Sequence, residues 1–446
     1  MAYPTFTQLQ QEVSQRLDDT ANIYWSAAEI QAYILEALRT WNSLARYWRT
    51  RVTFNTTQGV PYYDMTALLP ATVLGFNVTD LNLISTILFH LIEAQLTSTA
   101  FVGTDMFRLA DFFNAVNHRT NQFLVESGCV LLAYTGATLL NGPSPTIGRM
   151  PLPQTTIDVR KAGWIDQLSG LYTEMWRSNE WAASAFKVGW ELSPAIPQEY
   201  ATVVEPPYTL QLIPAPQANG QVELLAVNAT TGFGSTGGGG VLLATVLRVP
   251  DDYSWAVKFG AMADLLAKSG QAQDLLRAEY CHKRYQQGVA LARLNNSVVN
   301  AQLDGKQVFV NALQNFAFYN QNWRNLTQST PTDFALASWN LCAVSPPPDG
   351  NPHSVLVDLV QNAPLPVLGT DPVKVNPEEL DVIVGYTEHL ASFKFGGDEF
   401  VSTSPLLDRM IELAAVYNER LRASSDFLGE QSDKSVKEEK LKPRRR

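Results

Sequence analysis

Three pairs of adjacent carboxylates could carry acid–base chemistry in this sequence: Asp251-Asp252, Glu378-Glu379 and Asp398-Glu399. Two neighbouring carboxylates can serve as a general acid and a general base, as in glycoside hydrolysis. Each pair, however, lies where a helix is expected to begin, directly after a proline or a pair of glycines. Negative groups in a first helical turn interact favourably with the helix dipole and cap free amides. The positions therefore favour helix capping over catalysis.

Two further patterns lack the context that their chemistry needs. Gly232 to Gly237 matches the G-x-G-x-x-G pattern of dinucleotide sites, but more glycines and a strand-like run follow it where such a site requires a helix. We interpret it as a loop. The five histidines and three cysteines are scattered without HExxH or CxxC spacing, which predicts reduced thiols and no zinc site. We expect no catalytic, cofactor-binding or metal-binding residues.

Tryptophans next to arginines form two clusters, within Ala45–Arg51 and Glu174–Trp181. Such clusters can stack on nucleic-acid bases, but more often they anchor contacts between domains or subunits. The three arginines that end the sequence could pair with carboxylates of a neighbouring protein. The candidate interface residues are Trp48, Arg49, Arg51, Trp176, Arg177, Trp181, Arg444, Arg445 and Arg446.

The elements that would carry these residues follow from periodicity. The first 50 residues predict a helical pair, the second helix beginning at a Ser26–Glu29 capping box. Residues 49–65 alternate and turn at Gly59-Val60-Pro61, which predicts a β-hairpin. A further helix is expected over residues 104–127, because its apolar residues lie on one face and Gly128 can end it.

An unusual corner occurs twice in the sequence. Residues 210–220, LQLIPAPQANG, and residues 341–350, LCAVSPPPDG, each read as a strand, a proline-stiffened corner and a glycine turn. A helical hairpin is expected after each one. The nearly constant spacing of the landmarks predicts a diverged internal duplication. The matched landmarks are Gly220 with Gly350, Pro250 with Pro377, Gly270 with Gly397, and Tyr280 with Tyr417.

The expected fold is α+β and multi-domain. We predict an N-terminal helical domain with a β-hairpin over residues 1–150, followed by two related modules of β-strands plus an αα-hairpin. These modules would cover residues 151–300 and 301–430. Residues 431–446 are of mixed charge and then basic, with almost no apolar residues, which predicts a disordered tail.

The composition limits the function. Charged residues are 17% of the chain, below the usual value of about 25%, and this suits a subunit packed against others. The net charge of −10 argues against a body that coats nucleic acid. The most apolar run is interrupted by His90 and Glu93 and is too short to span a bilayer, and the N-terminus lacks the pattern of a signal peptide. We therefore expect no membrane partner.

Several stretches resemble a known family. Residues 29–65, EIQAYILEALRTWNSLARYWRTRVTFNTTQGVPYYDM, resemble the opening helices and hairpin of tailed-bacteriophage head-to-tail adaptor and neck proteins, as do residues 106–128 and 157–165. Residues 249–289, 386–400 and 413–423 resemble the helical hairpins of such virion proteins. The resemblance touches most of the chain, but its motifs are architectural.

The resemblance implies a structural virion protein without enzymatic activity, made in the host cytoplasm and located at the neck. Its copies would form a ring, commonly twelvefold, that joins the portal protein to tail or nozzle proteins. Double-stranded DNA would pass through the lumen without sequence-specific binding. An acidic body suits this role, because affinity for phosphates grows with each Lys or Arg. The alternatives are a phage-particle hydrolase of cell wall or glycan that uses an acidic pair, or a receptor-binding tail appendage.

Overall fold

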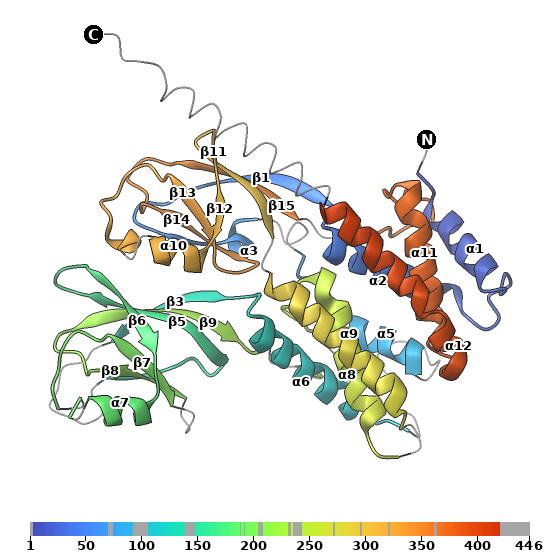
Figure 1. The fold of residues 1–446 in the computed structure, drawn as a ribbon, viewed down its shortest axis with the longest axis horizontal. Helices are drawn as coiled ribbons and strands as arrows, with labels where there is room; N and C mark the ends of the chain where they lie inside the picture. The colour runs from blue at the N-terminus through green and yellow to red at the C-terminus, as the bar shows by residue number, and fades with distance from the viewer. Residues whose placement is uncertain are drawn as a thin grey trace, which may run out of the picture. The chain divides into compact units, whose positions relative to one another are not determined.

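A computed structural model describes most of the chain: residues 3–69, 75–91, 106–138, 148–187, 189–190, 192–203, 208–230, 233–234, 243–270, 273–294, 297–319, 322–360 and 364–419. The fold is α+β and multi-domain, as expected (Figure 1). The chain divides into two compact units. Unit 1 comprises residues 1–48, 86–95 and 363–446, and unit 2 comprises residues 49–85 and 96–362.

Unit 1 is helical. Half of the predicted capping box of α2 is observed: the Ser26 side chain accepts a hydrogen bond from the main chain of Glu29, whereas the Glu29 carboxylate contacts Tyr33 and Lys394. Helices α2 and α11 pack together through buried residues such as Trp41 and Tyr386. The helices of this unit are α1 (Phe6–Arg16), α2 (Ala27–Ala45), the end of α5 (Asp80–Leu91), α11 (Pro377–Ser392), α12 (Gly397–Ser402) and a further helical stretch over residues 404–419.

Unit 2 contains one module of strands with a seven-stranded sheet, which we call the inserted module. Its strand order is β3-β9-β5-β6-β7-β8-β4, and its core includes Trp164, Tyr200 and Leu224. The elements are β3 (Leu132–Thr138), β4 (Arg149–Pro151), β5 (Thr156–Asp166), β6 (Tyr172–Arg177), α7 (Glu180–Phe186), β7 (Glu199–Val203), β8 (Thr209–Ile213) and β9 (Gly220–Asn228).

A second module of strands in unit 2, which we call the host module, has two four-stranded sheets. Their orders are β1-β15-β10-β11 and β12-β13-β14-β2. Phe54, Leu303 and Phe334 lie in its core. The elements are β1 (Arg49–Asn55), β2 (Tyr62–Asp64), β10 (Val298–Leu303), β11 (Lys306–Val308), β12 (Val310–Ala312), α10 (Leu313–Tyr319), η3 (Trp323–Asn325), β13 (Asp333–Leu336), β14 (Leu341–Ser345) and β15 (Ser354–Val360).

The strands of the two modules correspond in order, with β6 of the inserted module in the place of both β11 and β12. In the inserted module Trp164 of β5 pairs with Val222 of β9 and Thr173 of β6; in the host module Leu303 of β10 pairs with Val355 of β15 and Lys306 of β11. The parallel pair β6–β7 corresponds to β12–β13, and the short helix α7 to α10. Both proline corners contain a cis peptide bond, Ile213–Pro214 and Ser345–Pro346. The strand order and register of the two modules agree with a duplication, whereas the two predicted helical hairpins lie in different units.

The boundaries of the modules differ from those predicted. The inserted module lies between β2 and β10 in the sequence, and the host module includes β1 and β2, so the expected divisions at residues 150 and 300 are wrong. The predicted boundary at residue 430 and the predicted tail over residues 431–446 lie outside the described residues. The predicted hairpin over residues 49–65 is also wrong, because β1 pairs with β15 and β2 pairs with β14. The same register aligns Val222 with Val355. Gly220 is therefore equivalent to His353, and the predicted match of Gly220 with Gly350 is wrong.

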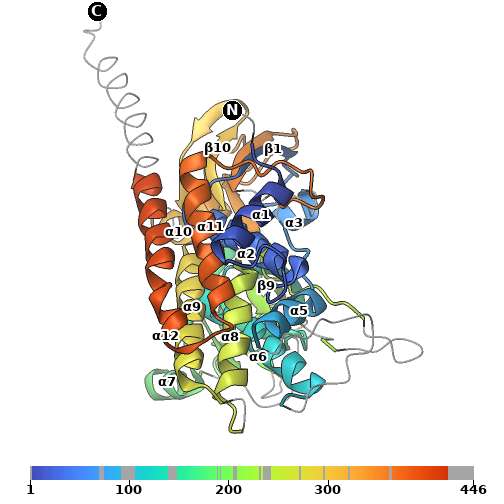
Figure 2. The same cartoon turned by 90° about the vertical axis from the view of Figure 1, so that its right-hand side faces the viewer.

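Helices precede and follow the strands of the inserted module in the sequence. Helix α6 (Leu109–Ser127) ends at Gly128, whose φ of 61° favours glycine. Helices α8 (Ser254–Ala267) and α9 (Leu275–Arg293) lie side by side (Figure 2). The turn helices α3 (Met65–Leu68) and η2 (Asp251–Tyr253) complete the unit. Across the residues described above, no helix has both the length and the apolar character needed to cross a bilayer.

Candidate functional site

The first carboxylate pair is buried and structural. Asp251 and Asp252 are 5% and 1% exposed. Oδ1 of Asp251 accepts hydrogen bonds from the main-chain nitrogens of Asn77 and Val78, each at 2.8 Å. The carboxylate therefore anchors a distant segment of the chain, where the sequence predicted a cap for the helix that follows. A pair enclosed in this way is not open to a substrate.

The other two pairs lie in first helical turns, as predicted. Glu379 accepts a hydrogen bond from the main-chain nitrogen of Asn376 at 2.9 Å and completes a capping box at the start of α11. Asp398 and Glu399 lie in the first turn of α12. The geometry supports helix capping for Glu379 and a favourable interaction with the helix dipole for the others.

The three thiols are enclosed within the described residues. Cys129, Cys281 and Cys342 are buried free thiols, and burial raises the pKa of Cys129 to about 12. In the part of the chain that the structure describes, no group of three or more His, Cys, Asp or Glu could hold a metal ion. Most of the glycine motif at 232–237 lies outside the described residues.

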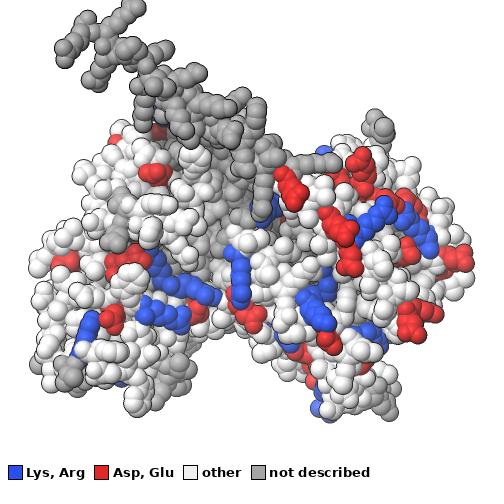
Figure 3. Space-filling model, in the orientation of Figure 1, with Lys and Arg blue, Asp and Glu red and all other residues white. Residues whose placement is uncertain are grey.

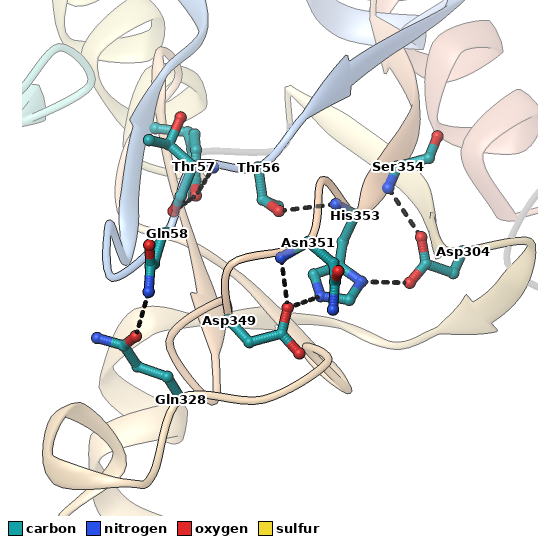
Figure 4. Close-up of polar contacts among 10 residues, drawn as sticks. Thr56, Thr57, Gln58, Asp304, Gln328, Asp349, Asn351, His353 and Ser354 are labelled. Atoms are coloured by element: carbon teal, nitrogen blue, oxygen red, sulfur yellow. Dashed lines mark hydrogen bonds and ion pairs between the residues drawn. The ribbon is translucent and has the colours of Figure 1, made fainter.

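A cluster of polar side chains surrounds His353 (Figure 4). Its Nδ1 lies 2.7 Å from a carboxylate oxygen of Asp304, and its Nε2 lies 3.0 Å from one of Asp349. The Asp304 carboxylate also accepts from the main chain of Ser354, and that of Asp349 from the main chain of Asn351, both at 2.8 Å. The cluster ties the proline corner to the β10–β11 turn.

The two carboxylates favour the protonated form of His353. Burial opposes the charge, but the two carboxylates outweigh it and raise the pKa of His353. Main-chain hydrogen bonds, followed by the bonds to His353, lower the pKa of Asp304 and of Asp349. Because both ring nitrogens are engaged by carboxylates from two different loops, we interpret the cluster as a structural clamp. The sequence analysis did not identify it, although Asp349 and His353 flank the corner four residues apart.

The predicted interface residues divide into two kinds. Trp176 and Trp181 are 73% and 88% exposed. Arg177 and Arg51 are engaged within the chain, with Asp158 at 3.1 Å and Asp358 at 2.6 Å. For the remaining predicted residues, Trp48 is half-buried against Tyr47, Arg49 begins β1, and Arg444, Arg445 and Arg446 lie outside the described residues.

An exposed aromatic pair occurs at equivalent positions of both modules. Trp176 in β6 and Phe186 at the end of α7 are 73% and 88% exposed. Their equivalents are Phe309, between β11 and β12, and Tyr319, at the end of α10, which are 78% and 84% exposed. The two pairs were not matched in the sequence analysis, because the alignment of the modules needed the strand register.

The rest of the visible surface carries few charges. In Figure 3 most of the molecule shows neither basic nor acidic side chains, in keeping with a charged fraction of 17%. Exposed rings on such a surface are typical of contact anchors between proteins.

Comparisons with known proteins identify no relative. A scan against protein-family models gave no match, and a search of curated proteins gave no significant match.

Proposed function

We propose that this chain is a structural virion protein of a tailed bacteriophage, a neck component that joins the portal to the tail around the DNA channel. The observation that carries the proposal is the exposed aromatic pair present in both modules. Aromatic side chains that protrude from a weakly charged surface are the residues that protein interfaces concentrate at their centres.

The place of the resembling segments supports the same proposal. Residues 29–65 contain α2 and the first two strands of the host module, and residues 106–128 contain α6, which precedes the first strand of the inserted module. Each of these two segments therefore includes a helix that comes directly before the first strand of a module.

In this proposal the chain acts as a ring member. A closed ring gives every copy the same contacts, and the resemblance favours twelve copies between the portal and tail or nozzle proteins. DNA passes through the lumen, and an acidic chain limits its adhesion to phosphates. The hydrolase alternative is weakened by the burial of Asp251 and Asp252.

The test is to purify the chain alone and with a portal protein, and to measure stoichiometry by native mass spectrometry and electron microscopy. We expect rings stacked on the portal. A chain that is a monomer inside intact particles, without contact to its own copies, would contradict the proposal. A hydrolytic activity abolished by Glu378→Gln or Asp398→Asn would favour the enzyme instead.

A further inference from the structure

A polar junction joins the two modules of unit 2. We call the contributing loop of the host module its donor side and the strands of the inserted module that it contacts its acceptor side. The guanidinium of Arg324 pairs with the carboxylate of Glu223 on β9, and these side chains are 9% and 10% exposed. The same guanidinium lies 4.9 Å from the ring centre of Tyr172. Asn325 accepts from the Tyr172 main-chain nitrogen at 2.7 Å and donates to its carbonyl at 2.8 Å. The loop after α10 thus docks on the outer face of β9, β5 and β6.

The inserted module has the same docking element. Trp190 follows α7 at the spacing with which Trp323 follows α10, and both indoles are buried. Leu192 consequently holds the place of Asn325, and it is 84% exposed. Trp181, on the preceding helix α7, is also exposed. The inserted module therefore has a counterpart of this donor loop, in which Leu192 replaces Asn325 and, in the sequence, Glu191 replaces Arg324.

The host module has the matching acceptor face. The internal junction uses a row of paired residues across β9, β5 and β6, namely Glu223, Gly163 and Glu174. The register gives the equivalent row in the host module as Leu356, Gln302 and Gln307, across β15, β10 and β11. These three side chains are exposed or half-buried. Leu356 replaces Glu223, just as Leu192 replaces Asn325, so one position on each side has changed from polar to apolar, while Gln302 and Gln307 keep the rest of the row polar.

We propose that the Leu192 loop of one copy docks on the Leu356–Gln302–Gln307 face of a second copy, repeating the internal junction between chains. The inference rests on the proposed ring and specifies its contact. A donor surface on one module and its acceptor on the other give a head-to-tail contact, which closes into a ring when the rotation permits. Such a ring contains twice as many related modules as chains.

Cysteine cross-linking tests the contact directly, because the native thiols Cys129, Cys281 and Cys342 are buried. A disulfide needs Cα atoms within about 7 Å, which makes the assay stringent. Leu192→Cys is mixed, under mild oxidation, with a second variant that has cysteine at position 356, 302 or 307. We expect a dimer from at least one mixture and none from either variant alone. The double variant Leu192→Cys, Gln302→Cys should form a ladder of oligomers.

The control is Leu276→Cys, at a residue 79% exposed in the first turn of α9, which should not cross-link to the acceptor positions. In a second measurement, Leu192→Asp should weaken self-association about tenfold or more in sedimentation experiments, whereas Leu276→Asp should not. Circular dichroism would verify that both variants fold.

Three outcomes would overturn the inference. Dimers of Leu192→Cys alone would indicate a two-fold contact of this loop with itself. Rings in native mass spectra, without cross-links from any mixture, would place the contact elsewhere and leave the proposed function intact. A chain that forms neither cross-links nor rings, alone or with a portal, would overturn the inference and the proposed function together.

Discussion

Breaking the ion pair between Lys394 and Glu29 should strongly destabilise unit 1. The ammonium lies 2.7 Å from the carboxylate, and the two side chains are 3% and 4% exposed. The Tyr33 hydroxyl donates to the same carboxylate at 2.8 Å. The pair joins the first turn of α2 to the segment that follows α11, two elements separated by most of the sequence.

The magnitude follows from burial. Glu29→Gln keeps the shape of the side chain but leaves the Lys394 ammonium enclosed without its counter-charge, which costs about 3–5 kcal/mol. Since domains are stable by only about 5–15 kcal/mol, this is a large fraction of the whole. The double variant Glu29→Gln, Lys394→Met removes both charges and should recover most of the loss, because buried pairs contribute little compared with apolar replacements.

Urea unfolding followed by tryptophan fluorescence measures the effect, with Trp25 and Trp41 as buried reporters within unit 1. The matched control is Glu279→Gln, which breaks the exposed pair with Lys283 and should leave the unfolding midpoint unchanged. The reasoning fails if Glu29→Gln behaves like this control, or if the double variant is as unstable as the single one.

Four other perturbations have defined outcomes. Because the pKa of His353 is raised, its contribution to stability is complete below about pH 6.5, the usual pKa, and is lost as pH rises through the folded-state value. In thermal melts, His353→Gln should lack this decrease in stability with rising pH. The exposed control His118→Gln should keep it. Gly288→Ala should cost about 1–3 kcal/mol in chemical denaturation, because its Cβ would meet that of Ala256 at 2.2 Å. Gly385→Ala, whose Cβ would meet Leu406 at 3.4 Å, should instead stabilise by up to about 1 kcal/mol. Deletion of residues 434–446 should reduce tail attachment and its salt dependence in particle assays, and unchanged attachment would count against a docking role for these residues.

Local signals in the sequence predicted local structure well. The Ser26 cap, the glycine after α6 and the capping box at Glu379 depend on neighbours within a few positions, and all three are present. The duplication was also visible, because proline corners and helical hairpins leave marks at fixed spacing.

What failed was the choice of partners over long distances. Alternation identifies residues 49–55 as a strand, but it cannot tell that the partner is β15, since any strand with an apolar face would satisfy the same pattern. The His353 clamp was missed for the same reason, because Asp304 and Thr56 come from separate parts of the sequence. Without information on distant partners, two strands adjacent in the sequence were predicted to pair with each other as a hairpin.

The nested arrangement has a consequence for synthesis on the ribosome. Strand β1 must wait for β15, about 300 residues later, which at 5–20 residues per second is roughly 15–60 s. The inserted module is complete earlier, when β9 emerges, and it can fold while the host strands still lack partners. Once folded, it holds the ends of a long segment together and lowers the entropy lost when the host sheet closes. A nascent chain arrested after residue 300 should thus contain one finished module and two unpaired strands, an intermediate with sheet edges open to aggregation.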